Sequence, residues 1–326
     1  MHKNNQKTMK LKNILYDLIT TSEDAAIAAA KWIGKNDEKA ADRAAVEAMR
    51  DAFNRIPFQG KIVIGEGERD EAPMLHIGEM VGVDNTNNKQ TFDIAVDPLE
   101  CTTKCARGID GSMTSMVVSE GGMLLPAPDV YMQKIAAKHP VIDLDKSIEE
   151  NLKALAEAKE CDVSELVVVI LDRERHKNIV DEVLSIGAKI RMISDGDIAG
   201  AIMTCIPESE VDMYIGVGGA PEGVIASAAV TMLGGYVEGR LIFKDESQVV
   251  RAKTMLQNPQ RKYSGAEMVN MDGSSGEIAF IITGVTSGDL VEGVKLFDGD
   301  GIKTETLCIY RDKDGMVWNR KVRTLR

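Results

Sequence analysis

The chain is poor in several residue types that mark common protein classes. Aromatic residues make up 4% of its 326 residues, and only four histidines occur. Its five cysteines are an odd number and form no CxxC pair, which argues against a structural zinc site and against a secreted disulfide framework. So few histidines are also a thin supply for an enzyme that uses histidine as nucleophile or as its main metal ligand.

Long apolar runs and basic patches are missing as well. No uninterrupted apolar stretch approaches the length of a membrane span, and the first residues are polar, without the apolar core of a signal peptide. The formal net charge of −12 argues against a nucleic-acid surface. An acidic balance suits a protein that attracts divalent cations, although it is also common in soluble proteins. We therefore expect a cytoplasmic protein with neither a nucleic-acid nor a membrane partner.

What is present is an ordinary globular composition, with 44% hydrophobic and 28% charged residues. This is enough for one large domain or two smaller ones. Hydrophobic periodicity predicts two helices at 20–33 and 40–55, followed by strands at 61–64, 93–96 and 111–119. Later, strands at 166–171, 189–193 and 211–215 alternate with helices, which predicts an α/β fold with a largely parallel sheet. We place the internal boundary near residue 150, between an N-terminal metal-binding subdomain (1–150) and a C-terminal substrate-binding subdomain (151–326).

The most informative motif lies where the strand 93–96 ends. Asp97 follows the strand, Pro98 favours a turn, and Glu100 projects from that turn. If a helix starts after Thr102, its free N–H groups face the same space and can hold a phosphate while the carboxylates hold Mg²⁺. A metal ion shields the negative charge of a phosphate ester, polarises it and lowers the pKa of a bound water. The alternative is a strand followed by an ordinary polar turn.

Four weaker patterns also follow predicted strands. Residues 65–68 place two carboxylates among glycines, where a solvated turn is the alternative. Residues 195–197 form a strand-to-helix turn that binds substrate hydroxyls or only caps the helix. Residues 216–223 are half glycine and open a helix, so the backbone can approach a phosphate closely, with Glu222 as an added metal ligand. Residues 173–177 offer cations for a distal phosphate, or are a solvated charge run.

Together these segments resemble one family, the class II bacterial fructose-1,6-bisphosphatases of the lithium-sensitive, metal-dependent phosphatase superfamily. The matching segments occur in family order from about residue 15 to residue 310. They are 31–34, 41–46, 64–74, 93–100, 127–132, 194–197, 218–224 and 283–286. The resemblance implies a layered α/β/α/β/α fold. It also implies hydrolysis of the 1-phosphate of fructose 1,6-bisphosphate by metal-activated water, a step of gluconeogenesis, in a homo-oligomer that is a dimer or tetramer.

The resemblance further implies roles for individual residues. Asp42 and Glu66 match ligands of one Mn²⁺ or Mg²⁺ ion, and Asp97, Glu100 and Glu222 match ligands of a second. Asp70 and Thr102 match catalytic positions. Substrate-contacting positions are matched by Glu100, Cys101, Thr102, Tyr131, Arg173, Arg175, Asp195, Gly196, Asp197 and Gly219.

The chain departs from the family pattern at two notable places. The family motif reads Asp-Pro-x-Glu-Gly-Thr, but Cys101 replaces its glycine, and Glu38 stands where the family tends to carry a lysine. Two alternatives therefore stay open beside a fructose-1,6-bisphosphatase. One is a dual enzyme that also hydrolyses sedoheptulose 1,7-bisphosphate. The other is a catalytically weakened member that binds sugar phosphates.

Overall fold

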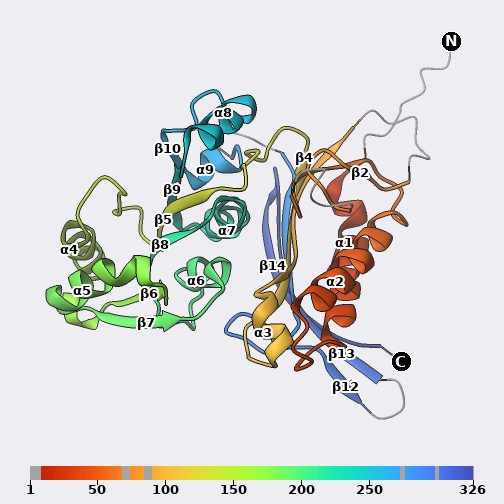
Figure 1. The fold of residues 1–326 in the computed structure, drawn as a ribbon, viewed down its shortest axis with the longest axis horizontal. Coiled ribbons are helices and arrows are strands. Elements are labelled where there is room, and N and C mark those ends of the chain that lie inside the picture. The colour runs from red at the N-terminus through yellow and green to blue at the C-terminus, as the bar shows by residue number, and fades with distance from the viewer. Residues whose placement is uncertain (1–8, 68–73, 84–89, 272–275, 298–300, 326) are drawn as a thin grey trace. The chain divides into compact units, whose positions relative to one another are not determined.

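The computed structural model of the protein describes residues 9–67, 74–83, 90–271, 276–297 and 301–325. Within these ranges no helix is both long and apolar enough to span a membrane. The chain forms two compact units (Figure 1). The first combines Met1–Leu124 with Gly273–Arg326, and the second is Leu125–Asp272.

This division differs from the expected boundary near residue 150, because the chain leaves the first unit earlier and returns to it at its end. Strand β11 (Ile278–Gly284) pairs antiparallel with β4 (Met113–Glu120), so the C-terminal segment completes the sheet of the first unit. Pairing between segments so far apart in sequence leaves no trace in the local hydrophobic pattern.

The first unit is built on an eight-stranded sheet of order β12-β13-β11-β4-β3-β1-β2, with β14 paired to β13. Only β1 and β3 run parallel among these pairs. The remaining strands are β1 (Gly60–Ile64), β2 (Met80–Val81), β3 (Phe92–Glu100), β12 (Lys295–Phe297), β13 (Gly301–Asp312) and β14 (Gly315–Leu325). The short helix α3 (Thr102–Arg107) follows β3 directly, as the sequence predicts.

Helices α1 (Leu11–Ala30) and α2 (Glu38–Phe53) cover one face of this sheet (Figure 1). The predicted start of the first helix at Thr20 is wrong. The Thr20 hydroxyl donates to the carbonyl of Tyr16 one turn earlier, as in a helix interior. The true start is set by Leu11, Ile14 and Leu18, which are buried along one face of the helix.

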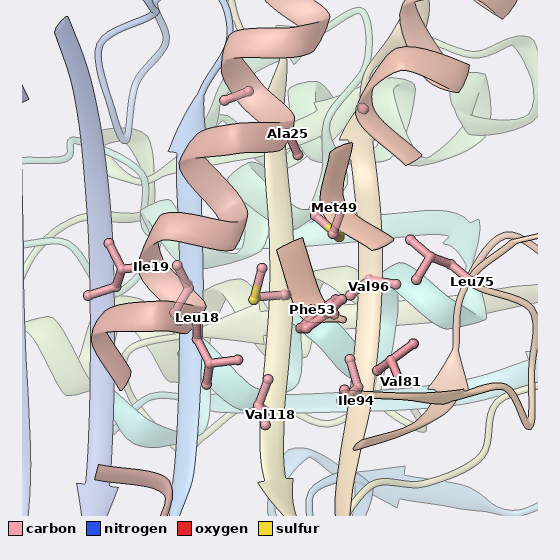
Figure 2. Packing of buried hydrophobic residues seen from close by; sticks show 14 of the residues in the cluster. Leu18, Ile19, Ala25, Met49, Phe53, Leu75, Val81, Ile94, Val96 and Val118 are labelled. Carbon is pink, nitrogen blue, oxygen red and sulfur yellow. The ribbon is translucent and has the colours of Figure 1, made fainter. Parts of the chain in front are cut away.

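The core of the first unit lies between these two helices and the sheet. Figure 2 shows Leu18 of α1 and Met49 and Phe53 of α2 directed toward Ile94 and Val118 of the sheet. Each of these side chains is fully buried, and a side chain of this size contributes about 1.5–3 kcal/mol when it is removed from water. This packing fixes α2 against β3, so it also fixes the polar residues that these two elements carry.

The second unit contains a six-stranded sheet of order β10-β9-β5-β8-β6-β7. Its strands are β5 (Tyr131–Ala137), β6 (Val167–Leu171), β7 (Lys189–Ile193), β8 (Met213–Gly219), β9 (Tyr236–Ile242) and β10 (Lys262–Ser264). Strand β6 runs parallel to β7 and β8, whereas β5 runs antiparallel to β8 and β9, and β9 antiparallel to β10. The sheet is therefore mixed, and the prediction of a largely parallel sheet holds for three strands only.

Helices lie on both faces of this second sheet. Helices α4 (Ile148–Lys159) and α5 (Lys177–Ile186) pack on the face that carries Ile135 and Ile215. Helices α6 (Asp197–Met203) and α7 (Ala220–Met232) cover the opposite face, and α8 (Glu246–Met255) and α9 (Gly265–Met268) complete the unit. The predicted α/β class is confirmed, with one helix layer on the sheet of the first unit and two on the sheet of the second.

A buried histidine joins two strands of the second unit at their ends. His176 is fully buried, and its Nε2 accepts the backbone N–H of Val217 at 2.8 Å. Its Nδ1 must therefore carry the proton, which it donates to the carbonyl of Leu171 at 2.8 Å. Burial lowers the pKa of His176, and the charges of Arg175 and Arg173 act in the same direction. The neutral imidazole links the end of β6 to β8.

This link predicts how the stability of the protein depends on pH. A histidine whose pKa is lower in the folded state is protonated first in the unfolded chain, so its contribution is present above about pH 6.5 and is lost as pH falls below it. We expect the stability that His176 contributes, measured with urea as the difference in free energy of unfolding between the wild type and His176→Gln, to shrink between pH 7 and pH 5. The corresponding difference for His139→Gln should stay constant. The same pH dependence in the His176 variant and the wild type would contradict the assignment.

Candidate active site

In the first unit the predicted metal ligands come from three elements. Asp42 lies in the first turns of α2, Glu66 follows β1, and Asp97 and Glu100 lie in the last part of β3. Helix α2 begins at Asp37, whose side chain accepts the N–H of Ala40 at 3.0 Å, an ordinary N-terminal cap. Asp42 follows the buried Ala41 and is half-buried, at the edge of the helix face that meets the sheet.

Three of these carboxylates act on one another electrostatically. Burial raises the pKa of Asp42 to about 6, with a further rise from the charge of Asp97. Burial raises the pKa of Glu66 to about 8, and the charges of Asp42 and Asp97 add to that rise. Partly buried like charges repel one another and lose hydration. The donor set fits a hard divalent cation, because carboxylate oxygens are the ligands that such a cation prefers.

Strand β3 does not turn at Pro98 but continues to Glu100 with a shift in its register to β4. The shift places an oxygen of Asp97 within 4.8 Å of one of Glu100. Asp97 also accepts the backbone N–H of Leu99 at 3.1 Å, and the Glu100 side chain is buried. The irregular strand end therefore brings together the two carboxylates of the motif.

Cys101 has the backbone conformation that explains the family's glycine. Its φ of 64° and ψ of 54° lie in the left-handed region, and Thr102 begins α3 immediately after it. A side chain in this region costs about 1–2 kcal/mol, whereas glycine adopts it freely. The chain thus carries backbone strain beside its carboxylates. The other departure, Glu38, is exposed at the start of α2, as is Lys39. Asp70 lies outside the described residues.

In the second unit the predicted substrate residues lie around the ends of four strands, β5, β6, β7 and β8. Tyr131, the first residue of β5, pairs in register with Gly219, the last residue of β8. The Arg175 guanidinium lies 5.1 Å from the centre of the Tyr131 ring and donates to the carbonyl of Val217 at 2.7 Å. Arg173 forms an ion pair with Asp195 at 3.2 Å. The run 173–177 is thus tied to neighbouring strands rather than merely solvated.

The turn at Asp197 is held from inside the unit. Gly196 occupies the position before α6, so Asp197 is not the helix cap. Its side chain is 7% exposed and forms an ion pair with Lys134, which also donates to the carbonyl of Gly219 at 2.9 Å. A Cβ at Gly219 would lie 1.8 Å from a carboxylate oxygen of Glu222, so a side chain there would displace that carboxylate. Glu222 itself lies in the first turn of α7.

Two polar residues near these positions were missed by the sequence analysis, Lys134 and Lys244. His176 was included there as part of the cationic run 173–177, but burial lowers its pKa. Lys134 lies on the same face of β5 as Met132 and Ala136, and a lysine on an apolar strand face is a detectable sign of a buried ion pair. Lys244 places its ammonium 4.8 Å from the centre of the Tyr131 ring. Nothing in the local sequence marks Lys244, because exposed lysines are common.

Partly buried carboxylates near strand ends in one unit, and cations with small residues at strand ends in the other, are consistent with the class of α/β metal-dependent hydrolases of phosphate esters. The family model described as "Bacterial fructose-1,6-bisphosphatase, glpX-encoded" matches residues 12–324. The chain therefore belongs to the family of bacterial fructose-1,6-bisphosphatases, which are phosphoric monoester hydrolases, and the resemblance predicted from its motifs is confirmed.

Similar proteins include three from cyanobacteria that are named D-fructose 1,6-bisphosphatase class 2/sedoheptulose 1,7-bisphosphatase. Those of Trichodesmium erythraeum and Synechococcus elongatus are 43% identical, and that of Synechocystis sp. is 42% identical. The matches cover 90–91% of this chain and 91–92% of each relative. Among solved structures, an extragenic suppressor from Pyrococcus furiosus is 14% identical, with a TM-score of 0.34, over 62% of this chain and 74% of that one. A likeness of that size supports no conclusion.

The conformation of Cys101 leads to a prediction about stability. Cys101→Gly relieves the strain of the left-handed backbone, whereas Cys101→Ala keeps it, and both variants lose the buried thiol. We expect the glycine variant to be more stable than the alanine variant by about 1 kcal/mol, measured by urea unfolding. Equal stability of the two variants would show that the backbone at residue 101 is not strained.

The raised pKa of Glu66 predicts that its charge destabilises the metal-free protein. A carboxyl whose pKa is raised in the folded state contributes stability below its unfolded pKa of 4.5, and this is lost as pH rises toward about 8. In EDTA, Glu66→Gln should match the wild type near pH 5 and exceed it by about 1–3 kcal/mol at pH 8. Glu47→Gln, at an exposed position of α2, is the control. A Glu66 variant that is less stable at pH 8 would refute the repulsion.

Proposed function

We propose that the protein hydrolyses the 1-phosphate of fructose 1,6-bisphosphate to give fructose 6-phosphate and phosphate, a reaction of gluconeogenesis. The proposal is carried by family membership over residues 12–324 together with the carboxylates of the first unit. Raised pKa values at Asp42 and Glu66 mark acids that a bound cation would return to their charged forms.

Two sets of carboxylates would hold the metal ions in this proposal. Asp42 and Glu66 bind one ion, and Asp97, Glu100 and Glu222 bind a second, each Mg²⁺ or Mn²⁺. Such ions neutralise the phosphate charge and activate water as the nucleophile. Glu222 belongs to the second unit, so its place in this set rests on the family resemblance.

The other predicted residues bind and orient the substrate. Arg173 and Arg175 lie beside Tyr131 and β8 and would pair with the phosphate that is not cleaved, since a guanidinium bonds phosphate oxygens in pairs. The turn Asp195-Gly196-Asp197 and the backbone of Gly219 would bind the sugar.

The chain also supplies groups near the bond that breaks. Thr102 would orient the attacking water, with Asp70 as an acid–base group. Glu100 and Cys101 lie beside Thr102, where the backbone N–H groups that open α3 would meet the phosphate. The dimer or tetramer and the cytoplasmic location stay predictions.

A dual activity is the second candidate. The cyanobacterial relatives carry both activities in their name, fructose 1,6-bisphosphatase and sedoheptulose 1,7-bisphosphatase. The two substrates share a phosphate ester at C1 and differ by one carbon before the distal phosphate. The distance from the reacting phosphate to Arg173 and Arg175 would therefore decide which substrate fits.

The weakened member is the third candidate, motivated by Cys101 and Glu38. Phosphate release from each substrate separates the three candidates. The dual enzyme hydrolyses both substrates, the fructose-1,6-bisphosphatase hydrolyses fructose 1,6-bisphosphate alone, and the weakened member hydrolyses neither.

The proposal is tested by phosphate release and by one pair of variants. EDTA should abolish release from fructose 1,6-bisphosphate, and excess Mn²⁺ should restore it. Glu222→Gln should lower turnover at least about 10-fold and shift the Mn²⁺ dependence to higher concentration. Glu246→Gln makes the same change in the first turn of α8 and should cost only a few tenths of a kcal/mol of stability. Full activity in EDTA would refute metal-dependent hydrolysis, and a fully active Glu222 variant would refute its role as a ligand.

A further inference from the structure

Lys134 occupies an unusual position for a charged residue. It lies in the middle of β5, on the face covered by α7, and its side chain is 4% exposed. Its strand neighbours on that face, Met132 and Ala136, are fully buried. A buried ion pair often contributes less to stability than apolar residues of similar size. Packing alone therefore gives no reason for a lysine at this position.

The ammonium of Lys134 bonds two segments that the proposed function uses. It forms an ion pair with Asp197, the first residue of α6, and donates to the carbonyl of Gly219 at the end of β8. Glu222 follows three residues after Gly219, in the first turn of α7. One buried side chain thus connects the turn that would bind the sugar to the turn that carries a proposed metal ligand.

The residues around the Lys134–Asp197 ion pair pack closely against it. A Cβ at Gly218 would lie 2.0 Å from the Asp197 carboxylate and 3.0 Å from the Lys134 ammonium. A Cβ at Gly223 would lie 2.6 Å from the Met132 sulfur and 3.1 Å from the Lys134 side chain. The hydroxyl of the fully buried Tyr214 also donates to Asp197, at 3.5 Å. The absence of a side chain at Gly218 is therefore matched to the ion pair, whereas Gly223 makes room first for Met132.

We propose that Lys134 is a positioning residue that holds Asp197 and the β8–α7 turn in one fixed arrangement. Its loss changes both the binding of the sugar bisphosphate and the affinity for the metal at Glu222. The inference rests on the proposed function, because it assigns those tasks to Asp197 and Glu222. It goes beyond that function by coupling the two tasks through a group that touches neither substrate nor metal.

The test compares Lys134→Met with the same change at a lysine just beyond the strand. Lys138 follows β5, is exposed and donates to the carbonyl of Leu233 at 2.7 Å, at the opposite end of α7. We expect Lys134→Met to raise KM for fructose 1,6-bisphosphate and to weaken Mn²⁺ binding, each about tenfold. Mn²⁺ binding is measured by calorimetry without substrate. Lys138→Met should leave both within about twofold of wild type.

Tyr214→Phe separates the two branches of the proposal and is useful even if Lys134→Met does not fold. It removes a bond to Asp197 without leaving a buried charge unpaired and without touching Gly219. We expect KM to rise a few-fold while Mn²⁺ affinity stays unchanged. Unchanged KM in this variant would overturn the role of the buried network in holding Asp197.

A purely structural Lys134 gives a different result. The urea midpoint of Lys134→Met would then fall while KM and Mn²⁺ affinity of the folded protein matched wild type, and this would overturn the proposal. A wild-type protein that binds Mn²⁺ but releases no phosphate would instead refute the proposed function. In that case the Mn²⁺ titration of Lys134→Met still decides whether Lys134 positions the β8–α7 turn.

Discussion

The partial burial of Asp42, Glu66 and Asp97 as neighbouring like charges is the constraint on which the first unit depends. Burial together with nearby like charges raises the pKa of Asp42 and of Glu66 far above the ordinary range of carboxyl groups. Such a cluster persists only if the surrounding packing holds it in place. That packing is the apolar layer between α1, α2 and the sheet, where Met49 and Phe53 anchor α2 against β3. The free energy gained by apolar burial thus maintains an arrangement of charges that is unfavourable without a cation.

The second unit places opposite charges, rather than like charges, beside one another. There the buried charges are paired: Lys134 with Asp197 inside the unit, and Arg173 with Asp195 nearer the surface. His176 stays neutral because burial lowers its pKa, and it bonds two backbone groups. A unit that is to bind an anionic sugar phosphate needs fixed donors, and paired or neutral groups can be buried at moderate cost. Neighbouring like charges in one unit and oppositely charged pairs in the other are consistent with cation binding and sugar binding, respectively.

Local sequence patterns predicted most of the elements, because a helix or strand with one apolar face repeats at a fixed period. The predicted strand 189–193 agrees with β7. The patterns failed where a distant contact decided the outcome. Glu23 lies near the wrongly predicted helix start at residue 20, and it is buried and bonded by Thr304 and Arg323 from the C-terminal strands. The antiparallel placement of β5 was likewise invisible, since strand direction depends on the partner strand.

The sequence by itself determined the family, the α/β class and the residue types of the site, because these are recorded in ordered motifs such as Asp97-Pro98-Leu99-Glu100. Only the tertiary structure decided that the C-terminal strands complete the first unit, that Cys101 has a left-handed backbone, and that Lys134 connects Asp197 to Gly219. The physical reason is the same in each case. A motif specifies side chains that are neighbours along the chain. Burial, backbone strain and ion pairing depend on groups that only folding brings together.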